Sequence, residues 1–254
     1  MDIDTTKPNA GRIYDYMLGG NHNFEADRAA ADQLLKFMPS AKNGMLLNRW
    51  FMHDVIDRLS EAGFDCFLDL ASGLPTQGYV HELVPNAKVL YNDRDPVTVA
   101  YGREIIAGLP NVRYNQSNIS EIGDILKAAD EHFAGQRKVA VMMVGIAYFL
   151  PDDVLKNIID TLYDWLAPGS QMALSWMKIN YADPRTEAIQ VMYRQMGSPF
   201  HDHEHTILPM LERWDLGEQG TIPLTQWVEA PEWYVPDSKD EEIAEVYGML
   251  VTRP

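Results

Sequence analysis

Two aspartates, each at the end of a short apolar run, are the residues of this sequence best placed for ligand chemistry. Asp69 ends a run that begins at Cys66, and Asp93 ends a second run that begins at Lys88, about two dozen residues further on. Runs of this kind predict buried strands. An acid after the second strand is typical of a nucleotide-binding unit, where it accepts hydrogen bonds from ribose hydroxyls. The pair therefore predicts a site for a ligand that contains a ribose.

The turn after the first aspartate favours a positively charged ligand. Ser72 and Gly73 have little or no side chain, so a ligand can lie against the bare backbone at the end of the strand. A phosphate-binding turn would offer backbone amides and a lysine here. No lysine follows this turn, and a helix is predicted from Gln77 to Leu83. The charge of Asp69 favours a cationic or amine-bearing ligand over a phosphate.

Two longer motifs connect these residues with a known family. The segment Arg12–Gly20 reads Arg-Ile-Tyr-Asp-Tyr-Met-Leu-Gly-Gly, and the turn Ser72–Gly78 reads Ser-Gly-Leu-Pro-Thr-Gln-Gly. With these motifs, nearly the whole chain resembles the class I S-adenosylmethionine-dependent methyltransferases, and more narrowly a bacterial branch that carries both. Ala71 stands where such turns have their first glycine. Because alanine adds only a methyl group, we expect a slightly tighter pocket.

The order of elements predicts an α/β fold. Alternating helical and strand patterns, joined by right-handed crossovers, favour a doubly wound sheet. The resemblance implies a Rossmann-like methyltransferase fold: a seven-stranded, mostly parallel sheet with an antiparallel C-terminal strand and an N-terminal helical lid. We expect residues 1–62 to form an arm and helices over the cofactor cleft, and residues 63–254 to form the core, with an insertion at about 178–213. Leu211–Leu216 and Val246–Thr252 are predicted to pair as the terminal antiparallel hairpin.

The resemblance implies S-adenosylmethionine as cofactor and S-adenosylhomocysteine as product. Asp69 would lie near the amino group of the cofactor, and Asp93 would accept hydrogen bonds from the ribose hydroxyls. Asn118 and Ile119 would flank the adenine. The expected cofactor-binding residues in the core are Asp69, Leu70, Ala71, Ser72, Gly73, Asp93, Arg94, Ser117, Asn118, Ile119, Gly145 and Ile146.

The N-terminal region is expected to complete the cofactor site. The resemblance places the arm over the pocket, where four of its residues could meet the amino acid end or the adenine of the cofactor: Arg12, Tyr14, Tyr16 and Asn23. Tyr14 and Tyr16 could equally anchor the arm by packing. Arg49 offers a guanidinium that could hold the cofactor carboxylate in a bidentate contact. A salt bridge at the surface or between helices is an equally good interpretation of that arginine.

The methyl acceptor is expected beyond the central strand. Lys138–Val144 is continuously apolar, as in a strand buried on both faces of a parallel sheet, and ligands bind beyond the ends of such strands. Gly145, Ile146 and Tyr148 should therefore border the reacting methyl group. The acceptor-side candidates are Tyr148, Trp176, His22 and His201. Because the cofactor carries the reactivity, no protein nucleophile is required, and the sequence assigns no general base.

Three alternating histidines invite a metal interpretation that the local pattern does not favour. His201, His203 and His205 would point the same way only in a strand, whereas the residues from Glu204 to Trp214 have a helical pattern. We therefore expect a solvated loop or the rim of the acceptor site here, and no metal.

Composition narrows the class of protein and its partners. With 254 residues and 46% hydrophobic residues, the chain can bury one substantial core. The net charge of −16 disfavours nucleic acid and anionic membranes as partners. No apolar run approaches the ~20 residues of a membrane span, and the N-terminus lacks the features of a signal peptide. We expect a cytoplasmic enzyme with a small-molecule acceptor, whose oligomeric state, monomer or homodimer, the sequence leaves open.

Two alternative functions share parts of this pattern. An NAD-dependent oxidoreductase would use the same ribose acid, but its turn requires three spaced glycines facing a pyrophosphate. Asp69, Ala71 and Pro75 disfavour that turn. A non-catalytic protein that binds S-adenosylmethionine or S-adenosylhomocysteine would keep the same pocket, and the sequence leaves this alternative open.

Overall fold

The chain folds around one seven-stranded sheet. The computed structural model describes residues 5–74, 78–229, 231, 234 and 243–254. The strand order is β3-β2-β1-β4-β5-β7-β6. The first five strands in this order are parallel, whereas β7 runs antiparallel to β5 and β6 runs antiparallel to β7. The strands are β1 (Cys66–Asp69), β2 (Lys88–Asp93), β3 (Val112–Gln116), β4 (Ala140–Met143), β5 (Gln171–Ile179), β6 (Ile222–Pro223) and β7 (Ala244–Thr252).

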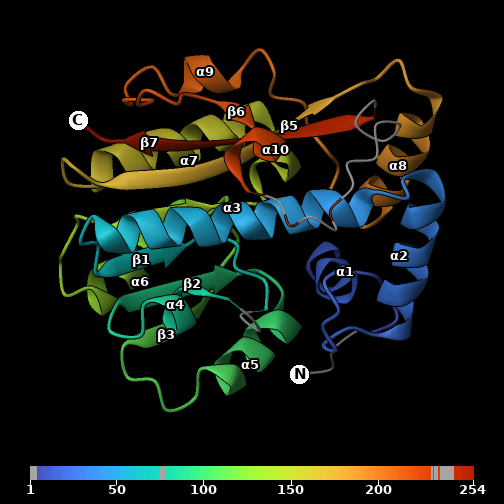
Figure 1. Cartoon of the computed structure of the whole chain (residues 1–254). Coiled ribbons are helices and arrows are strands. Elements are labelled where there is room, and N and C mark those ends of the chain that lie inside the picture. Colours follow the sequence, from blue (N-terminus) through green and yellow to red (C-terminus); the bar gives the residue numbers. More distant parts are fainter. Residues whose placement is uncertain (1–4, 75–77, 230, 232–233, 235–242) are drawn as a thin grey trace.

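Helices cover both faces of the sheet, which confirms the predicted α/β class. Figure 1 shows α3 crossing one face, with α6 and α7 behind the sheet. The 3₁₀ turn η1 (Ala147–Phe149) follows β4. The α-helices are α1 (Ala10–Met17), α2 (Glu25–Phe37), α3 (Ala41–Glu61), α4 (Val80–Leu83), α5 (Pro96–Ile105), α6 (Ile122–His132), α7 (Asp152–Trp165), α8 (Pro184–Gln195), α9 (Ile207–Met210) and α10 (Leu224–Trp227).

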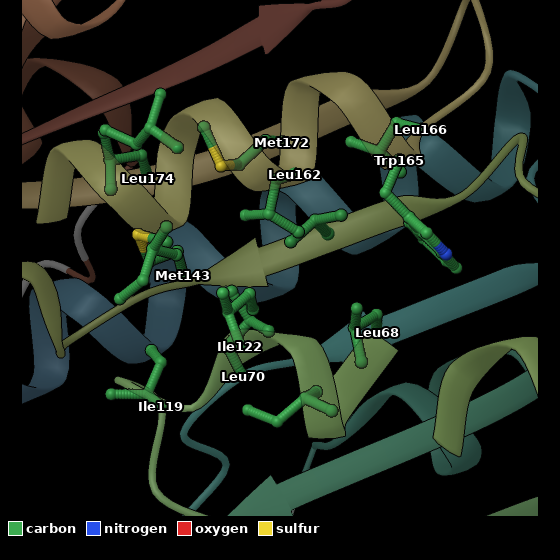
Figure 2. Close-up of a cluster of buried hydrophobic side chains, with 14 of the residues drawn as sticks. Leu68, Leu70, Ile119, Ile122, Met143, Leu162, Trp165, Leu166, Met172 and Leu174 are labelled. Atoms are coloured by element: carbon green, nitrogen blue, oxygen red, sulfur yellow. The ribbon is translucent and has the colours of Figure 1, made fainter. Parts of the chain in front are cut away.

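The alternation of side chains along β1 decides which face its final residue uses. Cys66 and Leu68 join the core under α6 and α7, which Figure 2 shows in close-up. Phe67 joins the opposite core, which is covered by α3, α4 and α5. Because successive residues of a strand point to opposite faces, Asp69 falls on the same face as Phe67. The acid at the end of β1 is therefore directed towards α3.

A third core joins the N-terminal helices to the insertion. It combines Ile13 and Met17 of α1 with Leu34 of α2 and with Ile189 and Tyr193 of α8, all of them buried. In Figure 1 these three helices gather beside one end of the sheet. Two helices near the N-terminus and one helix of the insertion thus form one cap, which we call the α1–α2–α8 cap.

The predicted terminal hairpin is wrong in its first strand. The outer partner of β7 is β6, Ile222–Pro223, and the segment predicted for that role contributes a single bridge between Asp215 and Thr252. Leu211 and Trp214 are instead buried in the core under α7. These two apolar side chains therefore serve packing under α7 and are not part of a strand.

Three predicted helices are shorter in the structure. Pro96, which favours a helix start, and Gly108 and Pro110, which favour a stop, predict a helix from Pro96 to Leu109, but α5 ends at Ile105. The helical pattern from Glu204 to Trp214 forms only the single turn α9. The helix expected from Gln77 begins, within the described residues, at Val80, whereas residues 75–77 of the Leu-Pro-Thr-Gln-Gly turn lie outside them.

Candidate functional site

The candidate site is a cavity of about 810 Å³ beyond the carboxyl ends of β1, β2 and β4. The turns after these strands form its floor, α3 forms one side, and the α1–α2–α8 cap covers it. Most of the residues predicted from the sequence line it, namely Tyr14, His22, Arg49, Asp69, Leu70, Ala71, Ser72, Gly73, Asp93, Arg94, Ser117, Asn118, Ile119, Gly145, Ile146 and Tyr148.

Asp69 is a buried carboxyl group at the centre of this floor. Its residue is 5% exposed, and burial raises the pKa of its carboxyl group to about 7. The nearby Arg49 and hydrogen bonds from Ala71 and Ser72 lower that pKa and offset the burial only in part. A cationic group of a ligand at this position would favour the ionised carboxylate.

Arg49 of α3 lies on the same side of the cavity, among tyrosines. Its Nη2 donates to the Tyr79 hydroxyl over 3.1 Å, and its guanidinium lies 4.4 Å from the centre of that ring. The Tyr79 hydroxyl in turn donates to the carbonyl oxygen of Ser72 over 2.9 Å. Tyr14 packs 5.9 Å from the same guanidinium, and its hydroxyl donates to the Met45 carbonyl. The arginine is thus held in the cavity wall beside Asp69.

Asp93 lines the cavity, as expected, and its carboxylate also accepts two backbone amides. One carboxylate oxygen accepts the amide of Gly73 over 3.1 Å, and the other accepts the amide of Asp95 over 2.9 Å. Burial raises the pKa of Asp93, and these two amides lower it. Asp93, the last residue of β2, therefore fixes the turn after β1.

Asn92 also lines the cavity, although it was not among the residues predicted from the sequence. It is fully buried, and its Nδ2 donates to the carbonyl oxygens of Leu70, over 3.0 Å, and Ser117, over 3.1 Å. Its Oδ1 accepts from Nδ2 of Asn115 over 2.9 Å, and its backbone pairs with Ser72. One side chain thus joins the turns after β1 and β3. Its position directly before Asp93 was the only signal in the sequence.

The turn after β3 forms the edge of the cavity. The Ser117 amide donates to the carbonyl oxygen of Asp93 over 3.1 Å. Asn118 is exposed, and its Oδ1 accepts the Ser120 amide over 3.2 Å. Ile119 is 7% exposed and packs on the core under α6.

A buried ion pair fastens the N-terminal arm above this floor. Arg12 donates through Nε to Asp27 of α2 over 2.8 Å, and both side chains are almost fully buried. A second contact of 3.4 Å reaches Asp95, which also caps α5 through the Thr98 amide. The arm is thereby attached both to α2 and to the segment that follows Asp93.

The two glycines of the arm allow its loop to fold back onto α1. A Cβ at Gly20 would lie 2.0 Å from Oδ1 of Asp15, so no larger residue fits there without a shift. The other oxygen of Asp15 accepts the His22 amide and Nδ2 of Asn23, each over 3.0 Å. Asn23 is used in this way and does not line the cavity. His22 does line it and packs edge-on against Tyr101 of α5, with 5.0 Å between the ring centres.

Two acceptor-side candidates lie away from the cavity, because both belong to other contacts. Trp176 stacks on Tyr247 with 4.5 Å between the ring centres, and its Nε1 donates to Thr221 over 2.9 Å. His201 packs beside His203, and neither ring is among the cavity-lining residues.

His203 and Asp152 hold the insertion on the turn after β4. The buried His203 ring places Nδ1 2.8 Å from Oδ1 of Asp152 and Nε2 3.1 Å from the Ala147 carbonyl oxygen. Asp152, the first residue of α7, also accepts a hydrogen bond from the Thr206 hydroxyl. The described part of the chain contains no group of three His, Cys, Asp or Glu side chains arranged to hold a metal ion. No helix within it combines the length and the apolar character needed to cross a bilayer.

Comparison with solved structures places the same fold in bacterial proteins. A DUF574 family protein from Streptomyces avermitilis superposes with a TM-score of 0.85 over 100% of both chains, with 26% sequence identity. A Thermobifida fusca protein classed as a methyltransferase gives a TM-score of 0.85 and 29% identity over 98% of this chain and 96% of its own. More distant structures, such as magnesium protoporphyrin IX methyltransferase from Synechocystis (TM-score 0.55, 13% identity), share the fold.

Sequence comparison identifies the family. A Mycolicibacterium vanbaalenii protein classed as an S-adenosyl-L-methionine-dependent methyltransferase is 26% identical over 163 residues, which are 61% of this chain. The match spans 52% of that protein, so this chain covers about half of its length. The family model described as S-adenosyl methyltransferase matches residues 1–253. The chain therefore belongs to the S-adenosyl methyltransferase family.

Proposed function

We propose that this protein transfers the methyl group of S-adenosylmethionine to a small-molecule acceptor. The observation that carries the proposal is that the buried Asp69 and the half-buried Asp93 border one cavity, and that Asp93 accepts the Gly73 amide in the turn that follows Asp69. They occupy the ends of neighbouring parallel strands, where α/β proteins bind nucleotide ligands.

The chemistry of the cavity fits the cofactor of the family. Asp69 would hold the cofactor's ammonium group, since its ionised form is stabilised by a nearby cation. Asp93 keeps lone pairs for ribose hydroxyls beside the two amides that it accepts. Arg49, beside Asp69, would hold the cofactor's carboxylate. Asn118 and Ile119 would border the adenine.

The protein's contribution to transfer would be positioning and exclusion of water. S-adenosylmethionine, when bound, supplies an activated methyl group, so no residue of the chain has to act as a nucleophile. The α1–α2–α8 cap covers the cavity and would shield a bound pair of reactants from solvent. Holding the acceptor in line in such an enclosure is itself a large source of rate acceleration.

A small acceptor agrees with the size and charge of the site. Ligand sites of small molecules have volumes of roughly 300–1,000 Å³. The cavity of about 810 Å³ lies high in that range, so it can hold the cofactor and a second small molecule. The net charge of −16 disfavours a nucleic acid as acceptor.

Calorimetric titration with S-adenosylhomocysteine tests the cofactor site. We expect binding by the wild-type chain, strong weakening in Asp69→Ala and Asp93→Ala, and no comparable binding of NAD. Unchanged affinity in both variants would refute the assignment of the site. Formation of S-adenosylhomocysteine from S-adenosylmethionine, measured over a panel of phenols, amines and carboxylic acids, tests catalysis. Binding without turnover on any acceptor would favour the non-catalytic alternative.

A further inference from the structure

Four aromatic side chains line one part of the cavity. Tyr148 and Phe149 come from η1, Tyr193 comes from α8, and Phe200 follows that helix. Their rings form one connected cluster, with centres separated by 4.1 Å between Tyr193 and Phe200 and by 5.9 Å between Tyr148 and Phe200. We call these four residues the aromatic wall. A flat apolar molecule would bury its surface well against it.

A buried polar atom beside this wall has no partner. Asn48 of α3 lines the cavity and is 2% exposed. Its Nδ2 lies 3.3 Å from the carbonyl oxygen of Gly44 and 3.5 Å from the hydroxyl oxygen of Tyr148. Its Oδ1 makes no hydrogen bond among the described residues. The Gly44 carbonyl fixes the orientation of the amide, because exchange of the two atoms would bring two acceptors together.

Three other polar side chains near the wall have partners among the described residues. Gln190 donates to the Phe200 carbonyl oxygen over 3.1 Å, and Thr186 donates to that of Asn180 over 2.7 Å. Arg94 donates to the Ser198 hydroxyl over 2.9 Å. A buried acceptor without a partner is costly in free energy, and a ligand donor removes that cost. Asn48 Oδ1 is therefore a buried acceptor beside the wall that invites a ligand donor.

Asn48 also stands between the aromatic wall and the proposed cofactor residues. Its neighbour in sequence is Arg49, which lies beside Asp69. The Tyr148 hydroxyl that Asn48 contacts lies 3.6 Å from the position that a Cβ of Gly145 would take. Gly145 follows β4, the strand whose end is expected to border the methyl group. A donor bound to Asn48 would thus lie between cofactor and wall.

Resting on the proposed function, we propose that Asn48 and the aromatic wall select the methyl acceptor. Oδ1 of Asn48 accepts a hydrogen bond from an O–H or N–H group of a neutral aromatic molecule whose ring lies against the wall. An anionic acceptor is disfavoured, because Oδ1 repels a carboxylate. Of the cations among the described cavity-lining residues, Arg49 is assigned to the cofactor's carboxylate, and Arg94 donates to the Ser198 hydroxyl.

Binding of small probes to the protein saturated with S-adenosylhomocysteine tests this proposal. Phenol and aniline carry the donor, toluene lacks it, and benzoate replaces it with a charge. For the wild-type chain we expect phenol and aniline to bind more tightly than toluene and benzoate, as measured by ligand-observed NMR titration. Failure of phenol and aniline to bind, or tighter binding of benzoate, would overturn the proposal.

The variant Asn48→Leu keeps the branched shape of the side chain, with a somewhat larger volume, and removes its polar atoms. We expect roughly fivefold weaker binding of phenol, an unchanged affinity for toluene, and an affinity for S-adenosylhomocysteine within about twofold of wild type. Asn157→Leu, at an exposed position of α7, is the matched control and should leave all three unchanged. Asn48→Ala replaces the leucine variant if that variant does not fold.

These readouts separate the two proposals. Undiminished phenol binding in the Asn48 variants, with S-adenosylhomocysteine still bound, would refute the role of Asn48 alone. If the wild-type chain itself does not bind S-adenosylhomocysteine, the proposed function is refuted, whatever the behaviour of the aromatic probes.

Discussion

The carboxylate of Asp93, at the end of β2, accepts the backbone amide of Gly73 in the turn after β1 over 3.1 Å. The second oxygen of the same group accepts the Asp95 amide. The acid proposed to bind the ribose therefore also sets the conformation of the turn that faces the rest of the cofactor. Loss of this side chain acts on both strands at once.

Two substitutions of Asp93 should distinguish what its charge and what its hydrogen bonds contribute to the affinity for S-adenosylhomocysteine. Asp93→Asn keeps one acceptor oxygen for a backbone amide, whereas Asp93→Ala keeps none. We expect S-adenosylhomocysteine affinity to fall in both variants and to fall further in the alanine variant, by about tenfold or more relative to wild type. Calorimetry measures the affinities. Equal affinities of wild type and Asp93→Ala would contradict the role given to this residue.

The affinity for S-adenosylhomocysteine should depend on pH through Asp69. Its pKa in the protein without ligand is raised to about 7 by burial, and an ammonium group binds the ionised form. Below that pKa, binding must first remove a proton, so we expect affinity to fall about tenfold from pH 8 to pH 6. Calorimetry in buffers of different ionisation enthalpy should detect the proton released at pH 6. A flat pH profile for wild type would argue against contact between Asp69 and the ammonium group.

The same carboxyl group should lower the stability of the protein without ligand. Because the pKa of the folded state is above that of the unfolded state, the unfolded chain binds fewer protons, and stability falls as pH rises from about 4 to about 7. A pKa raised from 3.8 to about 7 corresponds to up to roughly 4 kcal/mol above pH 7. We expect Asp69→Asn to unfold at higher urea concentration than wild type at pH 8, with the difference shrinking towards pH 4. If Asp69→Asn were less stable than wild type at pH 8, the buried carboxylate of Asp69 would not destabilise the folded protein, and this prediction would be refuted.

The sequence predicted the floor of the site well because that information is local. Asp69 and Asp93 each end an apolar run, and their spacing fixes the strand–helix–strand unit that brings them together. The strand and helix order followed in the same way from periodicity. The identity of the face of β1 that carries Asp69 also follows from alternation alone.

The residues that the sequence did not reveal depend on contacts between distant segments. Asn48 contacts Tyr148, 100 positions away, and nothing near either residue signals that pairing. Trp176 was predicted to lie on the acceptor side, but its ring stacks on Tyr247 because β5 pairs with β7. Strand β6 is only two residues long, too short for a periodic pattern.

The buried pair of Arg12 and Asp27 should contribute strongly to stability. Arg12→Met would leave the carboxylate of Asp27, which is fully buried, without its cation. Removal of one partner of such a pair costs roughly 3–5 kcal/mol. We expect urea unfolding of Arg12→Met to show a loss of this size. The variant Arg12→Met with Asp27→Asn should recover part of the loss, because asparagine has no charge to leave unpaired. A loss below about 1 kcal/mol in Arg12→Met would contradict the proposed importance of the pair.

Gly20 should be required for the arm to close over the cavity. A Cβ at this position would lie 2.0 Å from Oδ1 of Asp15, whose other oxygen holds the His22 amide. Because neither group can stay in place, we expect Gly20→Ala to weaken S-adenosylhomocysteine binding and to speed hydrogen exchange of residues 10–23, while the sheet amides stay protected. Gly123→Ala is the matched control: it places a methyl group in α6 where no atom lies within 4 Å. That variant should keep its affinity and gain up to about 1 kcal/mol of stability. Wild-type affinity and exchange in Gly20→Ala would show that the loop tolerates the methyl group and that its packing on Asp15 does not shape the site.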